Sequence, residues 1–458
     1  NSRFIFFLFA SLVFFSFSEA QTINYNDVAV IINDSSSVSI NIGNYFAQQR
    51  GIPPGHIIHV ATSTSETIDS TTFEAMRSQI EAALTVGNLV DSINYLVTTK
   101  GMPLRISKGN ACDSSHIPLN VQKCTCVESE LPLILGANAS DILQTGIVSN
   151  SYYNSNIHFD RSVAGIFLVS RLDGFTETQV RALIDHSGPE YYFYAPHAAI
   201  VLDYSQASAN SQPVFQSSQN SISTSLQPTG LLVYNDSDNT TFLTNFTEVI
   251  AYSGIHFAPN SIQPNFRWSP GSIAHLLVSR ATFSPISNED SLVGKVIEEG
   301  VSTLAGYTSA SFFGTSTKGE IFFSSYFDTT QSQRYNAAEA YYLASPQLSQ
   351  QNILIGDPKT SAIAEYIVGR PEPELADLVL YPNPGTGQFK VQGALEAGDV
   401  SILIRNELGQ LLFKAKAYHA GGEAAIPIRF ENASAGLYFV QIIAGSQHTV
   451  KKLIIRGF

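Results

Sequence analysis

Residues 28–53 read VAVIINDSSSVSINIGNYFAQQRGIP. The first six residues, VAVIIN, are almost all apolar, which predicts a strand that is buried on both faces of a sheet. In residues 35–49 the apolar side chains have helical spacing, Ser and Asp side chains can cap the first turn, and Gly51 and Pro53 end the helix. A buried strand followed at once by a helix is the repeating unit of α/β proteins.

The same alternation continues to about residue 360. Further buried strands are predicted at residues 56–62, 93–101, 165–174, 198–204, 230–236, 248–254, 274–280, 301–309 and 352–358. Helices are predicted at 71–86, from 176 onward, at 291–299 and at 336–344. We therefore expect an α/β body in which a largely parallel sheet is flanked by helices. An alternative is that the body consists of two tandem flavodoxin-like units that divide near residue 160.

The charge of the chain excludes two classes of protein. Its 458 residues include 25 Lys and Arg against 38 Asp and Glu, a formal net charge of −13. Nucleic-acid-binding proteins and general binders of anionic membranes need a basic surface. We therefore expect no nucleic-acid partner; we also expect no integral membrane segment, because no uninterrupted apolar run reaches the about 20 residues of a membrane-spanning helix.

The first residues have the pattern of a secretory signal. Arg3 precedes an apolar run from Phe4 to Phe17, and Ser18-Glu19-Ala20 follows it. This order predicts a signal peptide, residues 1–20, cleaved after Ala20. The run is shorter than the about 20 apolar residues of a membrane-spanning helix.

Export permits disulfides, and the three cysteines are Cys112, Cys124 and Cys126. A local disulfide from Cys112 to either Cys124 or Cys126 is the favoured interpretation. A zinc site would need His116 as a fourth ligand, and a catalytic thiol is a further alternative. We expect no cofactor and no resident metal.

The composition changes after the α/β body, which we place at residues 21–368. Residues 369–376 form a linker rich in Pro and Glu, and residues 377–458 contain short alternating strands separated by Gly and Asn turns. This pattern predicts a small antiparallel β-sandwich.

This C-terminal segment resembles the C-terminal sorting domain of the type IX secretion system of Bacteroidetes. The resemblance rests on YPNP at residues 381–384, on GQFKV at 387–391, on LGQ at 408–410, and on AGLYFV followed by VKKLII. It implies that the type IX secretion machinery recognises residues 377–458, and that the protein reaches this machinery by way of the periplasm. It further implies release of the protein or its attachment to surface lipopolysaccharide once the tail is removed.

The body resembles a family of exported bacterial proteins to which no activity is attached. Segments such as YLVTTKGMPLRI, LVSRLDG and ILIGDP carry this resemblance. It implies an exported α/β protein and no particular reaction.

Polar side chains follow many of the predicted strands: Asp34, Lys100, Arg171, Asp173, Asp203, Asp236, His256, Ser279 and Arg280. If the strands are parallel, these residues line one edge of the sheet, where α/β proteins bind ligands. Asp34 and Asp236 are instead expected to cap the next helix, and Arg171 to pair with Asp173.

His256 and Ser279 follow neighbouring predicted strands, which is similar to the arrangement of caspase-like peptidases of the gingipain type. In that group a His follows one strand and a Cys nucleophile follows the next. Here Ser279 occupies the place of the Cys, and no orienting carboxylate is evident in the sequence. The favoured interpretation is a non-catalytic, degenerate caspase-like binding domain, secreted or held at the outer-membrane surface. The alternative is a peptidase-like hydrolase with His256 and Ser279 as its catalytic residues.

Overall fold

The computed structural model describes residues 24–107, 124–143, 148–195, 198–205, 212–236, 242–256, 264–278, 292–308, 316–328, 334–365, 378–406, 411–430, 433–444 and 447–456. The predicted signal peptide and the predicted linker lie outside these residues. Among the helices of these segments, none is long and apolar enough to cross a membrane.

The first half of the body is built around β1 (Val28–Asn33). It pairs in parallel with β2 (Ile57–Val60) and with β4 (Tyr95–Thr99), and β4 pairs in parallel with β8 (Leu168–Leu172). All six residues of β1 are buried. This burial is the expected environment of a continuous apolar strand within a parallel sheet.

The helices of this half begin at capped N-termini. The hydroxyl of Ser36 accepts a hydrogen bond from the backbone N–H of Ser39 at the start of α1. Such a cap supplies a partner for one of the free N–H groups of the first turn. Four described helices of this half have such a cap: α1 (Ser37–Arg50), α2 (Ser70–Val86, capped by Asp69), α4 (Arg161–Ala164, capped by Asp160) and α5 (Glu177–His186, capped by Thr176).

The second half repeats this architecture with longer strands. β10 (Ala199–Ser205), next to the edge of the sheet, pairs in parallel with the edge strand β11 (Leu232–Asn235) and with β12 (Thr247–His256). β12 pairs in parallel with β13 (Arg267–Val278), which pairs in parallel with β14 (Thr303–Tyr307).

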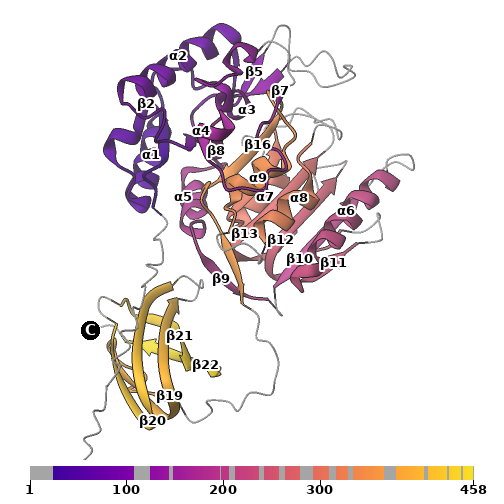
Figure 1. Cartoon of the computed structure of the whole chain (residues 1–458). Helices are drawn as coiled ribbons and strands as arrows, with labels where there is room; N and C mark the ends of the chain where they lie inside the picture. The colour runs from indigo at the N-terminus through magenta and orange to yellow at the C-terminus, as the bar shows by residue number, and fades with distance from the viewer. Residues whose placement is uncertain are drawn as a thin grey trace, which may run out of the picture.

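One strand joins the two halves. β16 (Asn352–Gly356) pairs in parallel with β8 and antiparallel with β14. Ten of the described strands thereby form a single sheet in the order β11-β10-β12-β13-β14-β16-β8-β4-β1-β2 (Figure 1). The expectation of a largely parallel α/β sheet is confirmed.

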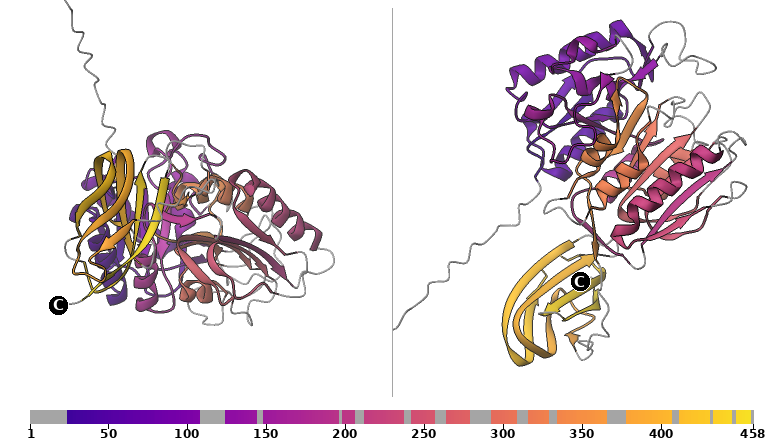
Figure 2. Two further views of the ribbon diagram at one scale, coloured as in Figure 1. Left: turned by 90° about the horizontal axis from the view of Figure 1, so that it is seen from below. Right: turned by 45° about the vertical axis from the view of Figure 1, so that its right-hand side comes forward.

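Helices cover both faces of the second half. α6 (Gln212–Leu226) packs against α8 (Gly319–Tyr326), and α8 packs against α9 (Ala337–Ala344). In Figure 1, and in the turned view on the right of Figure 2, α6 and α8 lie side by side over the strands. α7 (Leu292–Glu299) buries its apolar side chains in a separate cluster with residues of β12 and β13.

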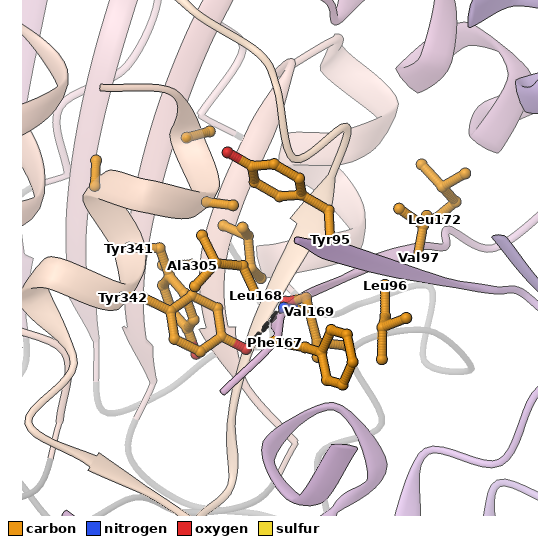
Figure 3. Close-up of a cluster of buried hydrophobic side chains, with 14 of the residues drawn as sticks. Tyr95, Leu96, Val97, Phe167, Leu168, Val169, Leu172, Ala305, Tyr341 and Tyr342 are labelled. Carbon is orange, nitrogen blue, oxygen red and sulfur yellow. Dashed lines mark hydrogen bonds between the residues drawn. The ribbon is translucent and has the colours of Figure 1, made fainter. Parts of the chain in front are cut away.

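Side chains of α9 connect the second half to the first. Tyr341 and Tyr342 are buried against strands β4 and β8 (Figure 3). The hydroxyl of Tyr342 makes hydrogen bonds to the backbone N–H of Val169 at 3.0 Å and to its carbonyl at 3.3 Å. The hydroxyl of Tyr342 is therefore hydrogen-bonded although it is buried, and its aromatic ring packs in the core.

Shorter elements connect these layers. The remaining strands of the body are β3 (Thr67–Asp69), β5 (Arg105–Ser107), β6 (Cys124–Cys126), β7 (Val148–Ser149), β9 (Tyr191–Tyr194), β15 (Gln347–Leu348) and β17 (Ala362–Glu365). The remaining described helix is α3 (Val127–Glu130), with 3-10 turns at Pro54–His56, Leu131–Leu133, Ala139–Asp141 and Gln227–Thr229.

One of the two disulfides considered from the sequence is wrong. Cys126 is a buried free thiol whose Sγ lies 3.2 Å from the carbonyl oxygen of Asn352. Burial raises the pKa of this thiol well above its usual value, so it is held in the neutral form. Cys112 and His116 lie outside the described residues, and the Cys112–Cys124 pairing stays a prediction.

The C-terminal segment is antiparallel, as expected. The long strands β19 (Gln388–Asn406) and β20 (Leu411–Arg429) pair along their whole length. On its other edge, β19 pairs first with β18 (Val379–Tyr381) and then with β21 (Gly436–Ala444), which pairs with β22 (Gln447–Ile455). One curved sheet of these five described strands thus encloses a single apolar core (yellow in Figure 2).

Candidate functional site

The polar residues at the strand ends do not share one edge of the sheet. β14 and β16 are antiparallel, so the strands of the second half run opposite to those of the first half. Their carboxyl ends therefore lie at opposite edges. The expectation of one common edge is wrong, because it assumed that every strand is parallel. Asp34, Lys100, Arg171 and Asp173 lie at one edge, and Asp203, Asp236 and His256 lie at the other.

The first edge is held by a buried ionic network. The guanidinium of Arg171 donates to Oδ2 of Asp173 at 2.6 Å and to Oε1 of Glu128 at 2.8 Å. It also donates to two backbone carbonyls, those of Met102 and Pro103. All three charged side chains are at most 2% exposed. The expected pairing of Arg171 with Asp173 is confirmed, and this network orders the loops of the edge.

Two further residues of the first edge have structural partners. Lys100 Nζ lies 3.3 Å from Oδ1 of Asp173. Asp34 does not cap α1, because Ser36 occupies that position. The carboxylate of Asp34 instead lies 2.7 Å from Nδ1 of His59 at an exposed site.

The second edge brings the backbone of three strands into register. His256, the last residue of β12, is opposite Ser205 of β10 and opposite Val278 of β13. Ser279 follows Val278 in the sequence and, like Arg280, lies outside the described residues, and the side chain of His256 is not described. The proposed dyad of His256 and Ser279 therefore stays a prediction.

A buried carboxyl group lies on the strand beside His256. Asp203, in β10, is opposite Gly254 of β12 and is 1% exposed. Its Oδ2 accepts a hydrogen bond from the hydroxyl of Tyr252 at 3.3 Å. Burial, and secondarily the negative charge of Asp236, raise the pKa of Asp203 to about 7. The signal in the sequence is an Asp inside an otherwise apolar strand, AAIVLDY.

A cavity of about 410 Å³ lies between α6 and α8 on the face of the second half. We call it the α6–α8 cavity. Most of the residues that line it have polar side chains, although Pro213 and Leu277 are apolar: Pro213, Ser217, Ser218 and Ser221 of α6, His275 and Leu277 of β13, and residues 316–320 at the start of α8. A shallow groove continues from it along α6, past Gln216, Asn220, Thr224 and Ser225.

Neither α6 nor α8 is predicted from the sequence, so the cavity between them is not predicted either. The floor of the cavity is His275, which the sequence showed only as part of the strand AHLLVSR. His275 lies next to Ser253 in the sheet and is 2% exposed. A His inside a buried strand is the signal that could have identified it.

Groups of three or more His, Cys, Asp or Glu residues that could hold a metal ion are absent from the described parts of the chain. The polar side chains that line the α6–α8 cavity are hydroxyls, one imidazole, one ammonium and one carboxylate. They are suited to hydrogen bonding with a polar ligand rather than to metal ligation.

Solved structures with some likeness to the chain include gingipains, the type of caspase-like peptidase to which the sequence was compared above. One is the Arg-specific cysteine proteinase gingipain R (RgpB), with 10% identity, coverage of 95% of this chain and 99% of that chain, and a TM-score of 0.37. Another is the complex of RgpB pro- and mature domains of Porphyromonas gingivalis, with 9% identity, coverage of 94% and 100%, and a TM-score of 0.39. TM-scores of this size carry no conclusion about the present chain.

Dimeric latent PorU of Porphyromonas gingivalis has 14% identity over 24% of this chain and 11% of that chain, with a TM-score of 0.16. No curated protein matches the sequence. Residues 379–456 match the family described as the secretion system C-terminal sorting domain. This tail marks the chain for export by the type IX secretion system, to the cell surface or into the surroundings.

Proposed function

We propose that the exported body is a ligand-binding domain without hydrolytic activity, and that the α6–α8 cavity is its binding site. The observation that carries this proposal is the set of polar side chains that converge on one cavity of about 410 Å³. This volume is within the range of small-molecule sites in proteins, about 300–1,000 Å³.

The residues at the neighbouring strand ends support a non-catalytic role. None of the three cysteines of the chain lies in the second half, so no Cys follows its strands in the position that the caspase-like arrangement gives to the nucleophile. A serine nucleophile needs a general base that is oriented by a carboxylate. A described carboxyl group on the neighbouring strand, that of Asp203, accepts from Tyr252 and has a pKa raised to about 7, so it is about half protonated at neutral pH and is a weaker orienting group for a His than a full carboxylate.

A hydrolase centred on His256 and Ser279 is the second candidate. The observation that favours it is the register of β12 and β13, in which His256 is opposite Val278, the residue before Ser279. Neighbouring strand ends of this kind are where the caspase-like arrangement has its His and its nucleophile. The binding proposal and the hydrolase proposal predict different results in one assay.

The assay measures hydrolysis of a panel of fluorogenic peptides and esters by the full chain. We expect the wild type to show no more hydrolysis than its His256→Ala and Ser279→Ala variants. Hydrolysis by the wild type that both substitutions abolish would overturn the binding proposal and establish the hydrolase.

A second experiment tests the cavity itself. Small polar probes (amino acids, monosaccharides, monocarboxylates and phosphate) are screened by ligand-observed NMR against the full chain and against Ser221→Trp, which fills the cavity. The matched control is Ser78→Trp, because Ser78 of α2 is also an exposed helical serine whose hydroxyl donates to the carbonyl four residues earlier. We expect at least one probe to bind the wild type and the control and not Ser221→Trp. The absence of such a probe would exclude the cavity as the binding site.

A further inference from the structure

His275 is a buried polar side chain, 2% exposed. Among the described residues neither Nδ1 nor Nε2 has a hydrogen-bond partner of ordinary geometry, and the nearby backbone of Thr317 acts on the ring only through a weaker contact. Leaving such a group unpaired costs about 1–3 kcal/mol, so native proteins rarely retain one without a ligand, a water molecule or a role in function. Since the ring lines the α6–α8 cavity, a molecule in the cavity is the available partner.

The N-terminus of α8 lies directly beside this ring. A Cβ atom on Gly319, the first residue of α8, would lie 3.2 Å from Nδ1 of His275. No side chain caps this end of the helix. The first N–H groups of a helix have no acceptor within the helix, and together with the helix dipole they favour an anion.

Lys318 adds a full positive charge at the same place. It immediately precedes α8 and lines the cavity together with Gly319. Its ammonium makes no salt bridge with any described carboxylate. His275, Lys318 and Gly319, the first residue of α8, therefore all line this one cavity.

The remaining charged group of the cavity is Glu320. It lines both the α6–α8 cavity and the groove along α6. Its carboxylate repels any negative charge on a ligand, so it favours the less charged of two anions. The rest of the groove offers uncharged hydroxyl and amide groups from Ser217, Ser221 and Asn220. These suit a polar, uncharged ligand body.

We infer that the α6–α8 cavity binds a small polar ligand through a single carboxylate or phosphate group, held by Lys318, His275 and the N-terminal N–H groups of α8. This inference rests on the proposed binding function and names the chemical class of its ligand. The recognised chemistry is an anionic oxygen group, which carboxylates and phosphates share. Charge-assisted hydrogen bonds to such a group are the strongest of those that this cavity can make.

The test titrates the full chain with sodium acetate, with inorganic phosphate and with uncharged glycerol at constant ionic strength. The signals of ¹⁵N-labelled His side chains are recorded, and those of His275 are assigned with His275→Gln. We expect acetate, phosphate or both to shift the His275 signals, and glycerol to leave them unchanged. Acetate and phosphate separate the two sources of the anionic group.

Substitution of Lys318 identifies the site without a change in the core. We expect Lys318→Gln to weaken anion binding by about tenfold, the effect of losing one hydrogen bond to a charged group. Lys295→Gln is the matched control, because Lys295 is a partly exposed lysine of α7, whose apolar side chains belong to the other cluster. Ser221→Trp should abolish the shift.

Each other outcome overturns the inference. Equal anion affinity in Lys318→Gln and the wild type would place the anion elsewhere. A glycerol shift without an anion shift, blocked by Ser221→Trp, would remove the anion preference and leave the binding function intact. No shift with any of the three probes would remove the inference as well, and the wider probe screen with Ser221→Trp would then decide on the binding function separately.

Discussion

Nδ1 of His275 lies 3.2 Å from the position that a Cβ atom would take on Gly319. The same Cβ would lie 2.6 Å from Cδ1 of Ile222, which is fully buried. Gly319 thus lets α8 approach both the sheet and α6. We expect Gly319→Ala to lower the free energy of unfolding of the body by about 1–3 kcal/mol, as overpacking of a core does.

Trp268, the only Trp in the chain, provides the measurement for this variant. It lies on β13, so its fluorescence during denaturant unfolding reports on the second half of the body. Gly55→Ala is the matched control, since no atom lies within 4 Å of a Cβ at that position. Equal stability of the two variants would contradict the close packing of α8.

Breaking the ionic network of the first edge should cost more. Arg171 is 2% exposed and pairs with Glu128 and Asp173. Its removal leaves the buried carboxylate of Glu128 without its cation and that of Asp173 with Lys100 alone, and breaking a buried pair costs about 3–5 kcal/mol. We expect this loss in Arg171→Ala, measured by chemical denaturation. Arg181→Ala, which breaks an exposed pair with Glu177, should lose less than about 1 kcal/mol. A similar loss in both variants would contradict the structural role of the network.

The strands were predictable from sequence and the orientation of β16 was not. Runs such as VAVIIN are apolar at every position, because both faces of the strand are covered, and the structure buries all six residues. NILIGDP has the same composition, and nothing in it distinguishes a parallel strand from an antiparallel one. The direction of β16 is set by the connection through α9 and divides the strand-end residues between two edges.

α6 escaped prediction for a different reason. Its buried residues Gln219, Ile222 and Leu226 have helical spacing, but the first of them is polar. Gln219 is buried because its amide donates to the backbone carbonyls of Asp203 and Ser253. Because this contact joins distant segments, the sequence alone does not show that the polar Gln219 belongs to the buried face of a Ser-rich helix. α6, which forms one wall of the cavity, is therefore not predicted.

His275 should make the body less stable in acid. Burial, assisted by the positive charge of Lys318 and opposed in part by the backbone of Thr317 nearby, lowers the pKa of His275 to about 4 from 6.5. Between pH 6.5 and pH 4, His275 is therefore protonated in the unfolded chain while it stays neutral in the folded chain. Stability is fully present above pH 6.5 and falls as the pH drops toward 4, by at most about 1.4 kcal/mol per pH unit. His275→Gln should flatten the profile of Trp268 unfolding in this window, and an unchanged slope would contradict the buried neutral imidazole.

Asp203 should have the opposite effect at higher pH. Its folded pKa is raised to about 7, by burial and then by the charge of Asp236, so the folded state keeps a proton that the unfolded state has lost above its ordinary value of 3.8. The contribution of this group to stability therefore falls as the pH rises from about 4 to about 7 and is constant above that. Asp203→Asn, which keeps an acceptor for Tyr252, should remove this slope and raise stability at pH 8 relative to pH 5. The comparison again uses unfolding followed by Trp268. If wild type and variant have parallel profiles, Asp203 is ionised in the folded protein at neutral pH, and it would then be available as the orienting carboxylate that a His256 hydrolase requires.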